Sequence, residues 1–100
     1  MEFYHFTEFA WPHLPPDDEF TSARLNLPSS VYNPKLGAEL YNMCLDQYVL
    51  ADELGLNCMV NEHHQTATCL NSSGVVPLSI LARQTKNARI LILGNPAANL

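Results

Sequence analysis

The chain has 100 residues, of which 47% are hydrophobic and 15% are charged, and its formal net charge is −5. This composition is typical of a globular protein with room for one small domain at most, and it excludes a disordered chain. Five basic residues against ten acidic ones, with no basic cluster, argue against binding to nucleic acid or to an anionic membrane surface.

The sequence also indicates where the protein works. Its amino-terminal residues carry no basic stretch followed by an apolar run, and no apolar run approaches the ~18 residues of a membrane helix. The three cysteines (Cys44, Cys58 and Cys69) form no CxxC pair, which favours a reducing compartment over a disulfide framework. We therefore expect a soluble cytoplasmic protein.

The first predicted element is a strand over residues 1–9, where aromatic and polar side chains alternate and both faces are used. Ala10-Trp11-Pro12 ends it. Residues 11–34 hold five of the seven prolines and the acidic triplet Asp17-Asp18-Glu19. They predict a long irregular loop, at about 10–34.

A helix is predicted after this loop. Asn33 is a residue type that caps helices, Pro34 suits the first turn, and Gly55 suits the position just beyond the last turn. Between them, apolar residues recur at helical spacing: Leu36, Leu40, Met43 or Cys44, Leu50 or Ala51, and Leu54.

Two more strands and one more helix are predicted downstream. Residues 56–60 form a short apolar run directly after the helix, which fits a buried strand of a parallel sheet. A polar loop leads to Val76-Pro77, which opens a second helix that ends at Asn87-Ala88. Residues 89–93 predict a third strand, and Gly94-Asn95-Pro96 ends it.

This order predicts an α/β fold whose parallel strands are joined by right-handed crossovers. The third strand is apolar on both faces, and no helix follows it to cover them. We therefore expect the 100 residues to be a truncated part of a larger domain. A partner subunit that completes the sheet is the alternative.

Reacting groups in parallel α/β folds gather at the carboxyl ends of the strands. Here those ends offer three groups: Thr7, Glu8 and Trp11; Asn61, Glu62, His63 and His64; and Gly94, Asn95 and Pro96. Histidine exchanges protons near neutral pH, and a neighbouring carboxylate can orient it or raise its pKa. Adjacent residues of a strand point to opposite sides. If the strand continues that far, only one of His63 and His64 can therefore face the site at its carboxyl end. The residues alone leave a catalytic site and an ordinary polar surface open, and a zinc site would need further ligands.

Four segments combine in a recognisable order and spacing: residues 2–8, residues 51–56, Asn61-Glu62-His63-His64, and residues 89–99. Together they resemble the amino-terminal part of the luciferase-like monooxygenase family, whose members are flavin-dependent (β/α)8 barrels. The resemblance implies that residues 1–100 are an incomplete barrel domain with its first three strands and first two helices. Such a segment is expected to be inactive alone.

The resemblance also implies an activity. Reduced flavin, usually FMN supplied by a separate flavin reductase, would activate O₂ to oxygenate a small organic substrate, and one branch of the superfamily uses the deazaflavin F420 instead. His63 would carry acid–base chemistry, and Glu62 and His64 would support or line the pocket. Gly94 and Asn95 would contact the flavin ring, with a non-prolyl cis peptide bond expected near them. We expect a homodimer or a heterodimer.

Two other functions remain open from the sequence. One is a metal-dependent barrel hydrolase using His63 and His64, which is disfavoured because the first strand holds only His5 and no His-x-His pair. The other is a non-catalytic binding or structural module that is complete at 100 residues.

Overall fold

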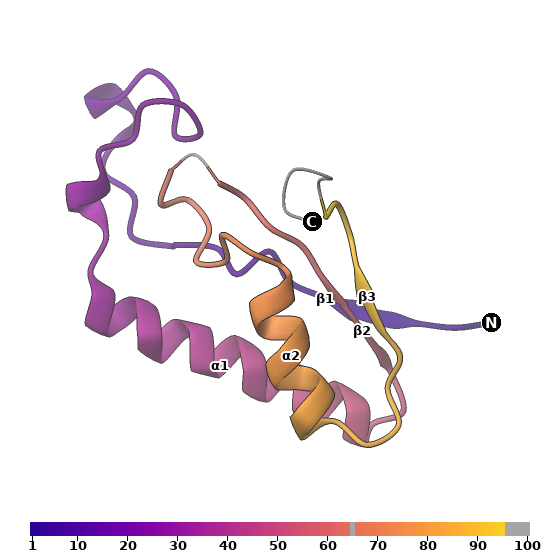
Figure 1. Cartoon of the computed structure of the whole chain (residues 1–100). Helices are drawn as coiled ribbons and strands as arrows, with labels where there is room; N and C mark the ends of the chain where they lie inside the picture. The colour runs from indigo at the N-terminus through magenta and orange to yellow at the C-terminus, as the bar shows by residue number, and fades with distance from the viewer. Residues whose placement is uncertain (65, 96–100) are drawn as a thin grey trace.

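A computed structural model of the chain describes residues 1–64 and 66–95. In these residues, three short strands alternate with two α-helices along the sequence, as predicted (Figure 1). They are β1 (Tyr4–Phe6), α1 (Pro34–Glu53), β2 (Asn57–Val60), α2 (Val75–Gln84) and β3 (Ile90–Ile92). The strands pair in parallel in the order β1-β2-β3, which confirms the parallel α/β arrangement.

The ends of α1 are where the sequence predicts them. Asn33 Oδ1 accepts a hydrogen bond from Leu36 N at 3.1 Å, so this side chain caps the helix, and Pro34 occupies the first position. Gly55 follows the helix with a φ of +82°, a left-handed conformation that costs glycine little because it has no Cβ.

The face of α1 that packs against the sheet matches part of the predicted apolar pattern. Where the pattern left two residues open, Cys44 and Ala51 are the buried ones, and Met43, Leu50 and Leu54 are 49%, 53% and 69% exposed. The buried residues of the helix are Gly37, Cys44, Leu45, Tyr48, Ala51 and Asp52. Apolar residues occur around much of this helix, so their spacing predicts a helix without fixing its rotation. The rotation follows the residues with specific partners, Tyr48 and Asp52.

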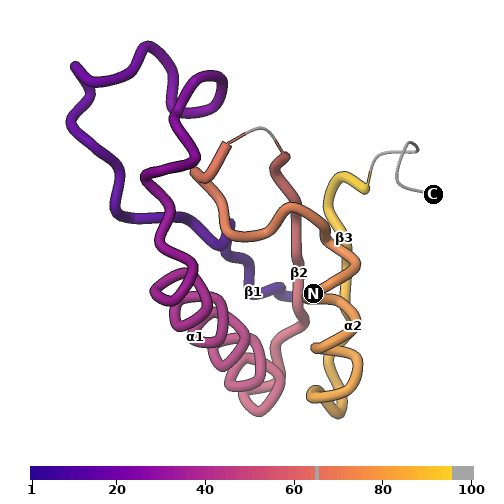
Figure 2. The backbone as a smooth tube through the Cα atoms, turned by 60° about the vertical axis from the view of Figure 1, so that its left-hand side comes forward, coloured from indigo at the N-terminus to yellow at the C-terminus, as the bar shows by residue number. Residues whose placement is uncertain are grey.

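Both helices lie on the same side of the sheet (Figures 1 and 2). The core joins Tyr48 of α1 and Leu81 of α2 to Cys58 and Val60, the two residues of β2 that point toward the helices. All four are buried. Burial of these side chains is the main stabilising contribution, at roughly 25 cal/mol per Å² of apolar surface removed from water.

The opposite face of the sheet carries a row of apolar side chains. Phe6 pairs with Met59, and Met59 pairs with Leu91, so the three lie side by side across the strands. Neither helix covers this face, and Phe6 and Leu91 are 40% and 44% exposed. Parallel sheets are normally covered on both faces.

Asp52, near the end of α1, binds the turn between α2 and β3. Its carboxylate accepts hydrogen bonds from the backbone N–H groups of Lys86 (2.7 Å), Asn87 (2.9 Å) and Ala88 (2.6 Å). The bonds from Lys86 and Asn87 are the largest causes that lower the pKa of Asp52 below its ordinary value. One side chain thereby satisfies three consecutive N–H groups that have no strand or helix partner.

The amino-terminal part of the chain departs most from the prediction. The first strand covers only Tyr4–Phe6, and Phe9 beyond it adopts a left-handed φ of +52°. The predicted loop at 10–34 contains two short 3-10 turns, Asp17–Glu19 and Ser29–Val31. Residues 96–99 of the predicted motif after the third strand lie outside the described residues.

Within the described part of the chain, neither helix has the length and apolar character to cross a membrane.

Candidate functional site

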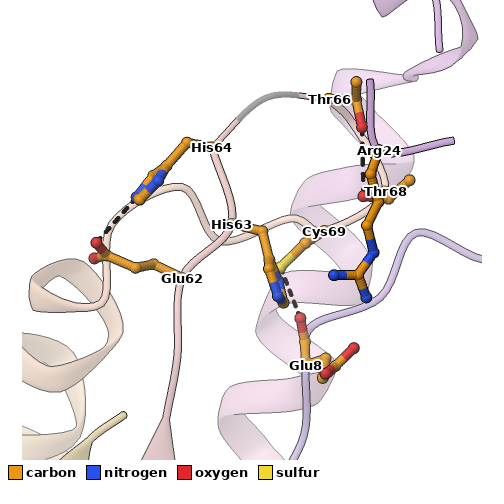
Figure 3. Close-up of a pocket in the computed structure, with 8 residues that line it drawn as sticks. All are labelled: Glu8, Arg24, Glu62, His63, His64, Thr66, Thr68 and Cys69. Carbon is orange, nitrogen blue, oxygen red and sulfur yellow. Dashed lines mark hydrogen bonds and ion pairs between the residues drawn. The ribbon is translucent and has the colours of Figure 1, made fainter. Parts of the chain in front are cut away.

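The carboxyl ends of β1 and β2 border a hollow of about 400 Å³ (Figure 3). It is lined by Glu8, Arg24, Glu62, His63, His64, Thr66, Thr68 and Cys69. Glu8 follows β1, residues 62–64 follow β2, and Arg24 comes from the long segment before α1. The hollow therefore lies at the end of the sheet where parallel α/β proteins place their reacting groups.

Glu62 is the buried acidic group of this site. Its Oε1 lies 2.9 Å from His64 Nε2, and its Oε2 accepts a hydrogen bond from Gly74 N at 2.6 Å. Gly74 directly precedes α2, so the carboxylate lies at the positive end of that helix, where a negative charge is stabilised. The Glu62 side chain is 1% exposed and that of His64 is 47% exposed. Glu62 thus holds His64 and the start of α2 together.

Gly74 packs closely against β3. A Cβ built at this position would lie 3.1 Å from Ile92 Cγ2, which is a tight contact, and 3.4 Å from Glu62 Oε2, which is an ordinary one. Glycine at residue 74 therefore avoids crowding of Ile92.

The two histidines lie beyond β2, which ends at Val60, and the alternation of a strand does not set their directions. Figure 3 shows His64 turned toward Glu62 and His63 turned to the other side, toward Glu8 and Cys69. His63 N donates a hydrogen bond to Asn71 O at 3.0 Å, which fixes the backbone beneath the imidazole.

The end of β1 is joined to the loop after β2 by a short antiparallel contact. Leu70 N donates to Phe9 O at 2.7 Å, and Trp11 N donates to Thr68 O at 2.9 Å. Between them, Cys69 Sγ donates to Glu8 O at 2.7 Å. Burial raises the pKa of the Cys69 thiol, so it remains protonated and is a poor nucleophile. These contacts bring Glu8 to the hollow that His63 lines.

Tyr48 joins the carboxyl ends of β1 and β2 from below. Its hydroxyl donates to Met59 O at 2.6 Å and accepts from Thr7 N at 3.2 Å. Because Phe6 pairs with Met59, a regular parallel ladder would join Thr7 N directly to Met59 O. The hydroxyl bonds both of these groups and so ties the two strand ends together where the hollow begins. Burial raises the pKa of Tyr48 to about 12, so the hydroxyl keeps its proton at neutral pH.

A second hollow of about 370 Å³ adjoins the first and shares His63, His64, Thr66 and Cys69 with it. Its wall is more apolar, because Leu27, Tyr32 and Leu70 contribute to it. The two hollows together offer a polar region next to an apolar one.

The sequence-predicted site residues divide into two groups. Glu62, His63 and His64 come together at one hollow. Gly94 and Asn95 are exposed after β3 and are not among the residues that line it. The peptide bond between Gly94 and Asn95 is trans, as are the others within the described residues, so the cis bond expected there is wrong.

Sequence reasoning missed Arg24, Tyr41 and Asn71. Arg24 comes from the irregular loop, and nothing in its neighbourhood indicates a pocket. Asn71 was part of a polar loop, and the signal that it differs from an ordinary loop residue is its burial, which the sequence does not show.

Comparison with protein-family models, with curated proteins and with solved structures finds no match to this chain. In residues 1–64 and 66–95, no group of three or more His, Cys, Asp or Glu side chains is arranged to hold a metal ion.

Proposed function

We propose that this chain is the amino-terminal part of a flavin-dependent monooxygenase built on a (β/α)8 barrel, and that His63 transfers protons in its active site. The observation that carries the proposal is the position of His63. Its imidazole lines a hollow at the carboxyl ends of two adjacent parallel strands. Histidine is the side chain best suited to proton transfer near neutral pH.

The uncovered face of the sheet supports the barrel. The strands follow one another in sequence order with both crossover helices on one face, which is the arrangement of consecutive barrel strands. The row of Phe6, Met59 and Leu91 on the other face would then point into the barrel interior, where bulky apolar side chains pack in layers. Further strands would cover it.

The size and polar lining of the hollow support a small-molecule site that could take one edge of a flavin. Its volume of about 400 Å³ is within the range of small-molecule pockets, roughly 300–1,000 Å³. Arg24, His63 and Thr68 offer polar groups to the ring edge, while Glu62 and His64 form a supporting wall because they are engaged with each other. Gly94 and Asn95, exposed at the end of β3, would extend the site.

When bound, reduced FMN would supply the electrons that activate O₂ toward a small organic substrate, and F420 is the alternative cofactor, for an oxidoreductase of the same superfamily. The chain's own residues would bind the substrate and hold or release a proton. The apolar wall of Leu27, Tyr32 and Leu70 would bind the organic substrate next to the polar hollow. His63 would hold or release a proton at its imidazole nitrogen.

The test uses the protein at its full natural length. We expect it to bind FMN, measured as quenching of flavin fluorescence, and to consume O₂ with reduced FMN from a flavin reductase in the presence of some of a panel of small organic substrates. His63→Ala should lower turnover about 10²–10⁴-fold, the usual contribution of a positioned acid–base group. His13→Ala is the matched control, because His13 is exposed and does not line the hollow.

Two results would contradict the proposal. Full turnover in the His63→Ala variant would remove His63 from the mechanism. A wild-type protein that binds neither FMN nor F420 would remove the flavin chemistry altogether.

A further inference from the structure

Asn71 lies at the centre of a buried hydrogen-bond network beneath His63. It is 2% exposed. Its Nδ2 donates to Asn61 O, its Oδ1 accepts from the Tyr41 hydroxyl at 3.3 Å, and its backbone O accepts from His63 N at 3.0 Å. Its backbone N donates to Cys69 Sγ at 3.4 Å. One residue therefore contacts α1, the end of β2 and the loop that borders the hollow.

The two contacts of Asn71 with the end of β2 lie on either side of Glu62. The side chain of Asn71 binds the residue before Glu62, and its backbone binds the residue after it. Together they fix the path along which the chain leaves β2. The direction of the His63 imidazole depends on this path, because β2 itself ends at Val60.

Tyr41 sets the orientation of the Asn71 carboxamide. A hydroxyl that donates to Oδ1 leaves Nδ2 on the other side, where it meets the carbonyl of Asn61. Burial is the largest cause that raises the pKa of Tyr41 to about 12, so the donor proton stays in place throughout the neutral range. Tyr41 belongs to the 20-residue helix α1, so the network links the backbone at His63 to a rigid element.

We propose that Asn71 is a positioning residue for His63 and that Tyr41 holds it in the required orientation. Its effect on turnover rests on the proposed function, whereas its effect on the imidazole does not. Asn71 touches the backbone that carries His63, and its hydrogen bond to Asn61 O is buried, so water cannot replace that bond without rearrangement.

The first measurement reads His63 directly. The full-length protein, labelled with ¹⁵N-histidine, is compared by NMR with its Asn71→Leu and Tyr41→Phe variants. Leucine has the same number and branching of side-chain heavy atoms as asparagine but no polar atom. It therefore removes the two side-chain hydrogen bonds, to Asn61 O and from Tyr41, and leaves the backbone bonds of residue 71 in place. We expect the imidazole resonances and titration curve of His63 to change in both variants, more in Asn71→Leu, while those of His13 stay unchanged.

The matched control is Asp52→Asn, which removes hydrogen-bonding capacity at the turn between α2 and β3, away from the hollow. It should lower stability without moving the His63 resonances. If Asn71→Leu fails to fold, Tyr41→Phe carries the test alone, because it keeps the aromatic ring in the core and removes one hydroxyl.

The second measurement reads turnover with reduced FMN and O₂. A misplacement of about 1 Å costs about 100-fold in rate, so Asn71→Leu should lower kcat about 100-fold, with KM for reduced FMN changed by less than about twofold. Tyr41→Phe removes one hydrogen bond and should lower kcat about fivefold. The pH dependence of kcat should shift in parallel with the NMR titration of His63.

The outcomes separate the two proposals. Unchanged His63 resonances in both variants would overturn the positioning role of Asn71. Changed resonances support it, whatever happens to turnover. If those resonances move and kcat stays the same, the positioning role stands and the catalytic role of His63 is lost.

Discussion

The hydroxyl of Tyr48 offers a test of how the ends of β1 and β2 are joined. In the Tyr48→Phe variant the ring stays in the core, but Met59 O loses its donor and Thr7 N loses its acceptor. Tyr48 is fully buried, so water cannot reach the gap that the hydroxyl leaves. An unsatisfied buried polar group costs about 1–3 kcal/mol.

We expect Tyr48→Phe to lower the free energy of unfolding by about 2 kcal/mol. Met59 O contributes most of this loss, because its bond is the shorter one and Thr7 is partly exposed. Urea denaturation followed by circular dichroism measures the change as a lower midpoint at an unchanged m-value.

Tyr4→Phe is the matched control. Tyr4 lies in β1 on the sheet face that the helices leave uncovered, and its hydroxyl makes no hydrogen bond to a described residue. Its loss should change the unfolding free energy by less than about 0.5 kcal/mol, as for most surface changes. If Tyr48→Phe costs no more than this control, the hydroxyl does not stabilise the junction of the two strand ends.

Three further predictions concern stability. Gly37→Ala should lower the unfolding free energy by about 1–2 kcal/mol, because its Cβ would overlap the Tyr32 hydroxyl and the gain in helix propensity is only about 1 kcal/mol. The Tyr32 ring now lies 5.1 Å from that of Trp11, so its displacement should change the fluorescence of the single tryptophan. Adding Tyr32→Ala should remove the clash. The lowered pKa of Asp52 contributes stability above its ordinary value of 3.8 that is lost as the pH falls through the lowered pKa, so acid titration of Asp52→Asn should show a weaker loss in that window. The pKa of Tyr41, raised to about 12, contributes stability that is present below pH 10.0 and is lost as the pH rises toward 12, and Tyr41→Phe should remove this alkaline loss.

The elements of the fold were predictable where their signals are local. Asn33 and Gly55 act on groups within a few residues of themselves, and both ends of α1 are confirmed. The short strand after the helix follows from an apolar run that no hairpin can accommodate. The rotation of α1 was not predictable, because it depends on Tyr48, whose hydroxyl binds backbone groups 11 and 41 residues away in sequence.

The site was predictable only in part for the same reason. Glu62, His63 and His64 are adjacent in sequence, so their placement at the end of a strand brings them together. Asn71 has the local sequence of a solvent-exposed turn, and its role depends on Tyr41, 30 residues earlier. The left-handed φ of Phe9 was equally hidden, because phenylalanine has no preference for that conformation.

Asp52 has a consequence for how the chain folds. Its carboxylate binds backbone groups 34, 35 and 36 residues ahead, so the turn into β3 is completed only when the end of α1 is already in place. The first strand–helix unit and the second therefore do not form as independent modules. Native-state hydrogen exchange should find the amides of Lys86 to Ala88 opening together with the last turn of α1, as one cooperative unit, although the two segments are far apart in sequence.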